Sequence, residues 1–220
     1  MPLVNYVTRE ITCKIVYYGP GRSGKTTNLR HLHARLPAER TGELVSLATE
    51  GDRTLFFDFL ALDLGVVAGF STRFQLYTVP GQSHYAATRR LVLQGADGVV
   101  FVADARRRQR DENLAALQDL HEQLAALGVD PRSLPLVFQW NKQDLPDELR
   151  DPAPVLDDLL NFRGAPAFAA DALGGVQVFE TMRAACGLVL RRLAGPASGA
   201  PDGAASKGAA PNVAAPALVA

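Results

Sequence analysis

A short segment near the N-terminus combines the residue types that bind phosphate. It reads GPGRSGKT, follows the apolar run TCKIVYY and precedes a helical pattern. Glycines let backbone N–H groups curl around an anion, and the first turn of a helix adds partial positive charge. The lysine can reach the outer phosphates of a nucleotide, and the threonine hydroxyl can ligate Mg²⁺. The pattern predicts a phosphate loop that uses Gly19, Gly21, Arg22, Ser23, Gly24, Lys25, Thr26 and Thr27.

A second polar set, NKQD, directly follows the apolar run LVFQW. The Asp144 carboxylate can accept hydrogen bonds from the N1–H and the 2-amino group of guanine, a pair of donors that adenine lacks. Asn141 can meet another polar edge of the base, the Lys142 stem can cover its ring, and the backbone N–H of Ala170 can donate to guanine O6. Beside a phosphate loop, this short match predicts a guanine nucleotide as the ligand.

A third candidate lies in the segment FQLYTVPGQ, which reads as a strand that Pro80-Gly81 brings to an end. Gln82 then lies at the start of a turn, where its amide can orient an attacking water, and Gly81 is counted among the residues that bind the nucleotide.

Apolar strands that alternate with helical patterns must position these groups, and this alternation predicts a layered α/β fold. The strand candidates are residues 11–18, 54–62, 70–78, 98–103, 136–140 and 165–170. The helix candidates are residues 25–36, 84–93, 109–127, 154–160 and 176–193. The loop 63–69 between the second and third strands is short enough for a hairpin, which predicts one antiparallel edge strand on an otherwise parallel sheet.

The bulk composition predicts a single domain with no global attraction to nucleic acid or lipid. The chain has 220 residues, of which 47% are hydrophobic, with 23 basic and 23 acidic side chains. Its two cysteines make no disulfide framework and are expected to be buried and inert. No secretory signal, lipidation motif or membrane anchor is recognised, so a cytoplasmic protein is expected. In residues 195–220, 18 of 26 are Ala, Gly or Pro, which predicts a disordered tail after a domain at 1–194.

The order of phosphate loop, PGQ turn and NKQD resembles the Ras superfamily of small GTPases. More narrowly, LVSLATEGDRTLFFDFLALDLG and TRFQLYTVPGQSHY resemble the bacterial MglA family, and the similarity extends over about residues 5–194. The resemblance implies a Ras-like three-layer α/β sandwich with a mostly parallel six-stranded sheet and one antiparallel edge strand. It also implies a switch between GTP- and GDP-bound states, with Mg²⁺, that controls cell polarity and gliding or pilus-driven motility.

The resemblance also assigns roles to residues between the phosphate loop and the PGQ turn. Thr54 resembles the first switch threonine, a metal ligand together with Thr26, although Thr49 is an alternative. Arg53 can supply positive charge to the transferred phosphoryl group in cis, while Gln82 orients the water. The implied partners are a Roadblock-type homodimeric GTPase-activating protein, an exchange factor, and motility or polarity effectors. They act on a monomeric G domain that is recruited to a cell pole.

Thr78 stands where most small GTPases carry the aspartate that holds a magnesium-bound water, and the MglA family resembles this chain in having threonine there. A hydroxyl can hydrogen-bond such a water but adds no charge. Asp58 or Asp52 could restore the missing charge, and the sequence does not choose between them.

Two other functions compete with a slow GTPase that needs a partner for full activity. A GTP-binding scaffold with little or no hydrolysis would not need Gln82 or Arg53, so their presence argues against it. A P-loop kinase for a small molecule is disfavoured because NKQD indicates guanine and no arginine-rich lid segment follows.

Overall fold

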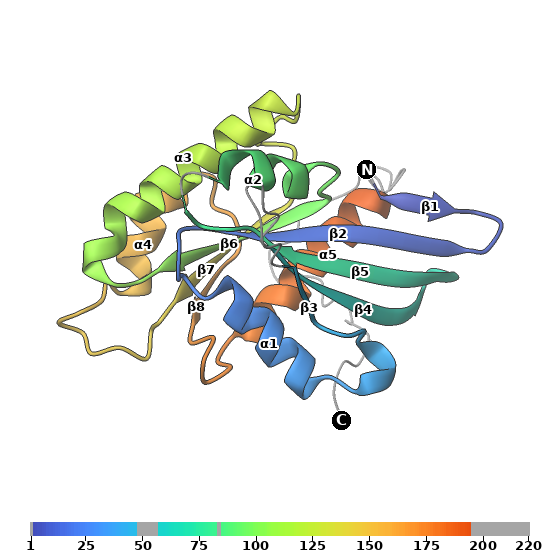
Figure 1. Ribbon diagram of the computed structural model, residues 1–220, viewed down its shortest axis with the longest axis horizontal. Helices are drawn as coiled ribbons and strands as arrows, with labels where there is room; N and C mark the ends of the chain where they lie inside the picture. The colour runs from blue at the N-terminus through green and yellow to red at the C-terminus, as the bar shows by residue number, and fades with distance from the viewer. Residues whose placement is uncertain (1, 48–56, 83–84, 195–220) are drawn as a thin grey trace, which may run out of the picture.

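The computed structural model describes residues 2–47, 57–82 and 85–194, which form one twisted sheet covered by helices on both faces (Figure 1). The strand order is β3-β4-β5-β2-β6-β7-β8, and β1 pairs antiparallel with the first residues of β2. The strands are β1 Leu3–Asn5, β2 Glu10–Tyr18, β3 Val45–Leu47, β4 Phe57–Val67, β5 Phe70–Thr78, β6 Gly98–Asp104, β7 Leu136–Asn141 and β8 Ala167–Ala170. The helices are α1 Lys25–Arg35, α2 Ala86–Leu93, α3 Arg110–Ala126, α4 Ala153–Leu160 and α5 Val178–Ala194, with short 3₁₀ turns η1 Ala38–Arg40 and η3 Arg107–Gln109.

The centre of the sheet is parallel, and its strands are buried on both faces. Strand β6, GVVFVAD, is buried at every position, and it pairs in parallel with β2 on one side and β7 on the other. Near-continuous apolar runs of this kind are typical of strands covered by helices on both faces. All parallel strands therefore end at the same edge of the sheet, where the polar motifs begin.

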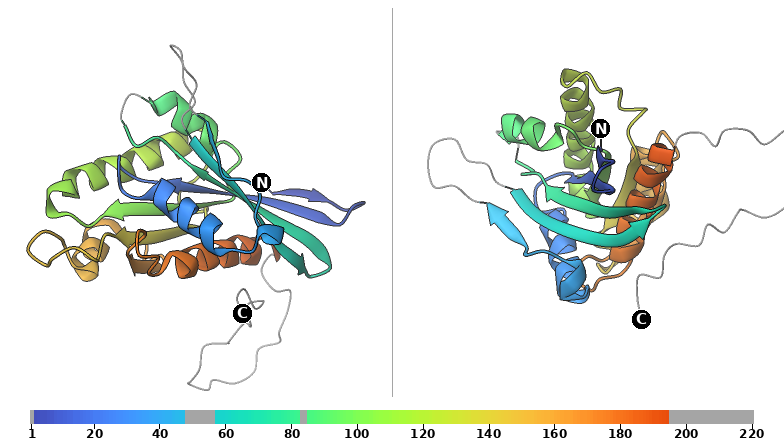
Figure 2. Two further views of the ribbon diagram at one scale, coloured as in Figure 1. Left: turned by 60° about the horizontal axis from the view of Figure 1, so that its bottom comes forward. Right: turned by 90° about the vertical axis from the view of Figure 1, so that its right-hand side faces the viewer.

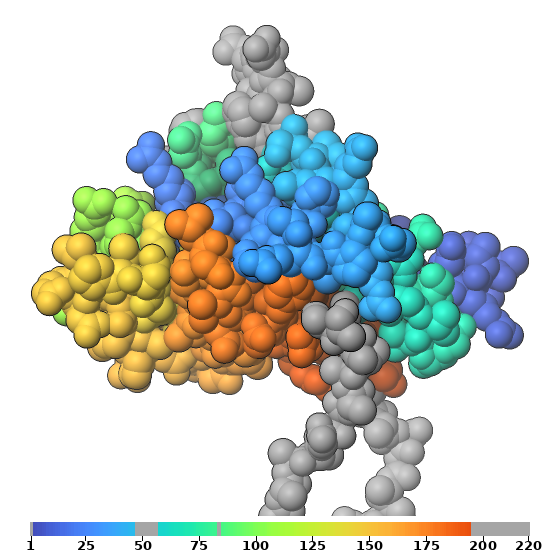
Figure 3. Space-filling model, turned by 90° about the horizontal axis from the view of Figure 1, so that it is seen from below, coloured from blue at the N-terminus to red at the C-terminus, as the bar shows by residue number. Residues whose placement is uncertain are grey.

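Alternation along β2 divides the core into two clusters. Cys13, Ile15 and Tyr17 face α1 and α5, whereas Val16 and Tyr18 face α2, α3 and α4. The two further views show this separation of helices into two layers (Figure 2). Seen from below, α1 and α5 lie side by side over one face (Figure 3). Cys13 and its neighbour Cys186 from α5 are both buried free thiols in this layer.

The predicted α/β fold with a mostly parallel sheet is confirmed. All six predicted strands and five predicted helices are present, with ends displaced by a few residues. Two short strands, β1 and β3, enlarge the sheet to eight strands, so the prediction of six was too low. Each has three residues, too few to show an alternating pattern. Strand β3 pairs antiparallel with β4, so β4 is not the outermost strand of the described sheet.

The predicted hairpin loop 63–69 is mostly strand. Strand β4 continues to Val67, and the chain reverses at Ala68 and Gly69, both with positive φ (51° and 83°). The pairing with β5 shifts register between Asp63 and Val66, where Gly65 also has a positive φ of 73°. A bulge at this glycine lets the strand continue past a position that looked like a turn in the sequence.

No helix within residues 2–47, 57–82 and 85–194 is long and apolar enough to cross a membrane.

Candidate functional site

The segment GPGRSGKT forms the connection between β2 and α1, and its glycines are required by close approaches. Gly19 has a φ of +135°, and a Cβ there would lie 2.2 Å from the carbonyl oxygen of Val102 on β6. Gly24 has a φ of +108°, and a Cβ there would lie 2.1 Å from Nδ2 of Asn141. Only glycine fits both the left-handed backbone and the contact. The loop is thereby packed against the neighbouring strand ends.

Lys25 is the first residue of α1 and is buried inside the curve of this loop. Its ammonium donates to the carbonyl oxygens of Gly19 and Pro20, at 2.9 and 2.6 Å. Burial lowers the pKa of Lys25 to about 7, helped by the positive charges of Arg89 and Lys142 and opposed by Asp58. The Ser23 hydroxyl is also buried, and it has no hydrogen-bond partner among the described residues.

The NKQD segment is joined directly to the loop. The Asn141 amide donates to the Ser23 carbonyl oxygen at 2.6 Å and accepts from the Ala172 N–H at 2.8 Å. Both ends of this amide are thus engaged by protein, so Asn141 fixes the two loops to each other rather than leaving a free polar edge. Lys142, with a φ of +73°, donates to the Arg22 carbonyl oxygen at 2.8 Å.

Asp144 differs from its neighbours because its side chain is exposed. Within the described part of the chain its carboxylate makes no hydrogen bond or ion pair, so both oxygens remain available to a ligand. Ala170, the last residue of β8, is buried beside Asn141, and its carbonyl accepts from the Gln143 N–H at 2.9 Å. Donation from the Ala170 N–H to a base remains a prediction.

The PGQ turn lies on the phosphate loop. A Cβ at Gly81 would be 2.3 Å from the backbone nitrogen of Gly21, so this contact requires glycine. This contact does not require glycine at position 21, because the nearest atom to a Cβ at Gly21 would be the carbonyl oxygen of Gly81, at 3.8 Å. Gln82 follows directly, and its exposed side-chain amide makes no hydrogen bond to the described residues.

Asp58, on β4, lies beside Thr78, the threonine that stands where most small GTPases carry an aspartate. Its Oδ2 accepts from the hydroxyl of Thr78 at 2.8 Å and from the hydroxyl of Thr26 at 2.6 Å. Its Oδ1 accepts from Ser46 at 2.7 Å, and its own N–H donates to the Thr78 hydroxyl at 2.9 Å. The structure thus brings a carboxylate to the strand end where Thr78 supplies none.

Four residues considered at this site, Thr49, Asp52, Arg53 and Thr54, fall within 48–56 and lie outside the described residues.

Two charged groups at the site were not anticipated. Asp104 ends β6 fully buried and accepts from Lys142 at 2.6 Å and from Arg106 at 2.5 Å. Burial opposes its ionisation, but these hydrogen bonds hold the pKa of Asp104 below its usual range. In the sequence, Asp104 is a single carboxylate at the end of the apolar run GVVFVAD, and this pattern could have marked it as a site residue. The second group is Arg89 on α2, which contacts Asp119 on α3, a pairing that no spacing in the sequence reveals.

A cavity of about 1080 Å³ opens on the side of the phosphate loop that faces α2 and α3. Its walls come from the phosphate loop, the PGQ turn, and the facing sides of α2 and α3. The phosphate loop contacts the PGQ turn through Gly81, NKQD through Asn141 and Lys142, and Asp58 through Thr26, so these segments meet at one edge of the sheet.

Comparison with known proteins identifies the family. No protein-family profile matches the chain. The mutual gliding-motility protein MglA of Myxococcus xanthus (strain DK1622) is 51% identical over 193 residues, which are 88% of this chain and 98% of that protein. ADP-ribosylation factor-like protein 6 is 32% identical in Caenorhabditis elegans and 33% identical in Caenorhabditis briggsae, each over 60% of this chain and 61% of the relative. The chain therefore belongs to the MglA family of Ras-like small GTPases.

Proposed function

We propose that this protein binds GTP and hydrolyses it to GDP, and that the two bound states form a molecular switch in cell polarity and surface motility. The observation that carries the proposal is the direct connection between the phosphate loop and NKQD. Asn141 and Lys142 donate to carbonyl oxygens of Ser23 and Arg22, so one rigid unit presents both a phosphate cradle and an exposed carboxylate at Asp144. A guanine nucleotide has both matching parts.

The phosphate side of the cradle offers donors to an anion. Among the described residues, Lys25 hydrogen-bonds only to carbonyl oxygens of its own loop, and phosphate oxygens would replace them and favour the charged ammonium. The Ser23 hydroxyl is a further buried donor without a partner in the described chain. On the base side, Asp144 selects guanine because adenine would leave the carboxylate without a donor.

The residues present also fit a magnesium ion. Thr26 and Asp58 bring a hydroxyl and a carboxylate within 2.6 Å of each other beside the loop, and hard oxygen ligands of this kind are those that Mg²⁺ prefers. We propose that Asp58 supplies the charge that Thr78 lacks, and that Thr54 adds a hydroxyl. When bound, Mg²⁺ neutralises charge on the outer phosphates of the nucleotide.

Hydrolysis requires an oriented water and positive charge near the phosphoryl group that is transferred. The exposed amide of Gln82 is the proposed orienting group, because it lies next to the glycine that contacts the phosphate loop. Arg53 is the proposed source of charge in cis. Hydrolysis by the chain alone is then slow until a partner fixes both segments.

The proposed biological role follows the name of the relative from Myxococcus xanthus, a gliding-motility protein. By the same resemblance, a Roadblock-type homodimer is the proposed activating partner, and an exchange factor and motility or polarity effectors are the other proposed partners. The G domain acts as a monomer that is recruited to a cell pole from the cytoplasm.

The test of the function compares GTP with ATP in binding and steady-state hydrolysis. We expect GTP to bind more tightly by at least about two orders of magnitude, because ATP leaves a carboxylate unpaired. Asp144→Asn should shift preference toward xanthine nucleotides, whereas Asp147→Asn, in the same loop, should not. Equal affinity for ATP and GTP would contradict the guanine assignment. Tight GTP binding with no hydrolysis above the Gln82→Leu level would instead favour the scaffold alternative.

The test of the partner uses a Roadblock-type homodimer and the GTP-loaded protein. The homodimer should bind the GTP form preferentially and accelerate hydrolysis. Arg53→Ala should remove the acceleration, worth ~10³–10⁵ in rate for a correctly placed arginine, while the complex still forms. Acceleration that survived Arg53→Ala unchanged would show that the arginine comes from elsewhere.

A further inference from the structure

Arg89 is a buried arginine that the mechanism above does not use. It lies on α2 with only 7% of its side chain exposed, and it faces α3. An arginine is rarely buried to this extent unless its five donors are engaged. Its contacts therefore indicate what it does.

The guanidinium of Arg89 bridges the PGQ turn and α3. One terminal nitrogen, Nη1, donates to the carbonyl oxygen of Gln82 at 2.5 Å and reaches that of Pro80 at 3.5 Å. On the other side, Nε lies 2.7 Å from Oδ2 of Asp119, and Nη2 donates to Oδ1 at 3.3 Å. The planar fork thus contacts the residues on both sides of Gly81 and a carboxylate on α3.

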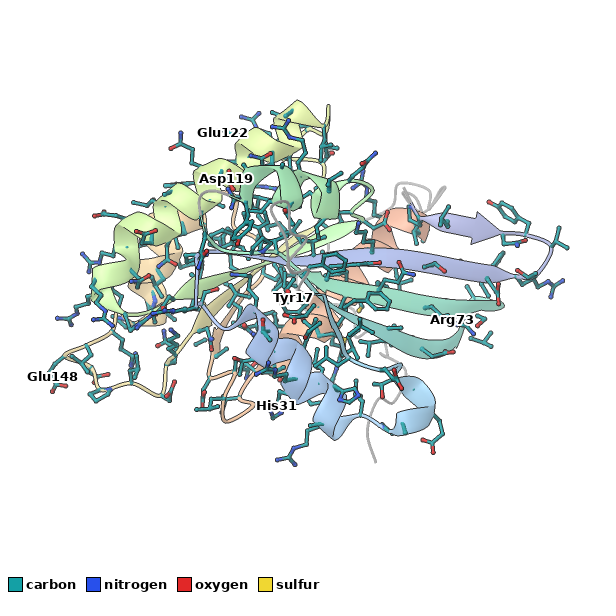
Figure 4. All side chains as sticks on the ribbon, in the orientation of Figure 1. Tyr17, His31, Arg73, Asp119, Glu122 and Glu148 are labelled. Carbon is teal, nitrogen blue, oxygen red and sulfur yellow. The ribbon has the colours of Figure 1, made fainter. Side chains whose placement is uncertain are left out.

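Asp119 is in turn held by two further donors. It accepts from Gln123, one turn along α3, at 3.1 Å, and from the hydroxyl of Tyr18. Burial opposes its ionisation, but the hydrogen bonds from Tyr18, Arg89 and Gln123 keep the pKa of Asp119 below its usual range. Asp119 lies on α3 near α2 (Figure 4), so the carboxylate can serve as a fixed anchor for Arg89.

Tyr18 extends this network to the phosphate loop, because it is the last residue of β2 and directly precedes Gly19. The PGQ turn is therefore held from two directions. Gly81 lies against Gly21 by backbone contact, while Arg89 holds the flanking carbonyl groups and is anchored through Asp119 and Tyr18 to the base of the same loop.

We propose that Arg89 is a positioning residue for Gln82: anchored by Asp119, it fixes the backbone of the PGQ turn so that the Gln82 amide faces the phosphate loop. The inference rests on the proposed role of Gln82 in hydrolysis. Arg89 is assigned no contact with the reacting atoms and acts through the backbone carbonyl groups of Pro80 and Gln82. A displacement of about 1 Å in a catalytic group can cost about 10²-fold in rate, so a backbone anchor at this point has a large effect.

The first measurement requires no hydrolysis. Arg89→Met keeps the length of the side chain and removes its donors, and Asp119→Asn removes the anchoring charge from the other side. In the full-length GDP-bound protein, we expect amide hydrogen exchange at Gly81 and Gln82 to be about tenfold faster in both variants. Arg90→Met is the matched control, because Arg90 donates to Gln123 on α3 and makes no hydrogen bond to the described residues of the turn. Exchange at the unmutated rate in both variants would overturn the proposal.

The second measurement asks whether Arg89 acts through Gln82. Single-turnover GTP hydrolysis should fall about 10–10²-fold in Arg89→Met, while GDP affinity stays within about threefold. The double variant Arg89→Met with Gln82→Leu should be no slower than Gln82→Leu alone. A further loss in the double variant, or an equal loss of GDP affinity, would overturn the positioning role. If hydrogen exchange responds as expected but the unmutated protein hydrolyses no faster than Gln82→Leu, the role of Gln82 in the proposed function is wrong, whereas the Arg89 anchor stands.

Discussion

At the scale of single residues, the proposed compensation for the charge that Thr78 lacks depends on a contact between two neighbouring strands. The β-branched Thr78 ends β5 with a hydroxyl, and Asp58 on the adjacent β4 brings its carboxylate to that hydroxyl and to Thr26. Because β4 and β5 pair antiparallel, two residues far apart in the chain share this position. The carboxylate and the hydroxyl at this position come from two different strands, so neither strand alone supplies both groups.

Asp58→Asn tests this compensation. The amide can still accept from Thr26 and Thr78, so the fold is kept, but the charge that favours Mg²⁺ is lost. We expect the Mg²⁺ concentration needed to retain fluorescent GDP to rise roughly 10–100-fold, equivalent to about 1.5–3 kcal/mol. The rate of fluorescent GDP release, measured over a series of Mg²⁺ concentrations, gives this requirement. Asp63→Asn, on the same strand, should leave the Mg²⁺ dependence unchanged; an equal shift in both variants would contradict the role of Asp58.

The depressed pKa of Lys25, at about 7, makes nucleotide binding pH-dependent. In an unfolded chain a lysine titrates near 10.4, so the unfolded state binds more protons between about pH 7 and 10. Stability of the nucleotide-free protein should therefore rise with pH in this window. Phosphate restores the ammonium, and GDP binding at pH 8 should take up close to one proton.

Calorimetric titrations in buffers of different ionisation enthalpy measure this uptake. At pH 6, Lys25 already carries its proton, and the uptake should disappear. The same heat in all buffers at pH 8 would show that the ammonium is charged before GDP binds.

At the scale of elements, a buried polar network joins two helices to the sheet. Gln139, in the middle of β7, exchanges two hydrogen bonds with Asn28 of α1, at 2.7 and 2.9 Å, and donates to Thr181 of α5 at 3.1 Å. All three side chains are buried. Since Asn28 also donates to the Gly24 carbonyl oxygen, the network supports the start of the helix that follows the phosphate loop.

Gln139→Leu should destabilise the protein by roughly 2–4 kcal/mol, because it leaves buried groups of Asn28 and Thr181 unpaired. The free energy of unfolding in urea, measured at one GDP concentration, gives the value. Gln118→Leu, on the exposed side of α3, is the control and should change it by less than about 0.5 kcal/mol. A decrease of less than about 1 kcal/mol in the free energy of unfolding of Gln139→Leu would contradict the prediction and show that Asn28 and Thr181 find other partners.

The elements also show which features could be read from the sequence. Long periodic segments such as α3, and apolar runs such as β6, were predicted because their patterns are local. The phosphate loop and NKQD were predicted because each is a contiguous motif. The strands β1 and β3 were missed because three residues carry no period. The partner of Thr78 and the Arg89–Asp119 pair were not predictable, because they depend on how distant strands and helices pack.

At the scale of the whole molecule, the described core lies between β2 and α5. Both apolar clusters draw on strands and helices between β2 and α5, and α5 ends at Ala194. A chain that ends at Ala194 should therefore keep its GDP affinity within about twofold and its thermal midpoint within about 2 °C. Fluorescent GDP titration and thermal unfolding of the two chains measure this. A larger loss would show that residues 195–220 contribute to the domain.

The burial of both cysteines has a practical consequence for observing this protein at work. Burial, with a smaller effect of Asp97, raises the pKa of Cys13 to about 12, and burial likewise raises the pKa of Cys186. The thiolate is the form of cysteine that attacks such reagents, so Ellman's reagent at pH 8 should modify neither cysteine in the native protein and both in denaturant. Early reaction of the native protein would show that the α1 and α5 layer opens.

The natural chain is thus already a suitable background for dye labelling. Cysteines introduced at the exposed positions Gln94, after α2, and Glu148, beyond NKQD, would be the reactive thiols. A donor and an acceptor fluorophore at these two positions could follow single molecules through successive rounds of nucleotide turnover, without removing either native cysteine.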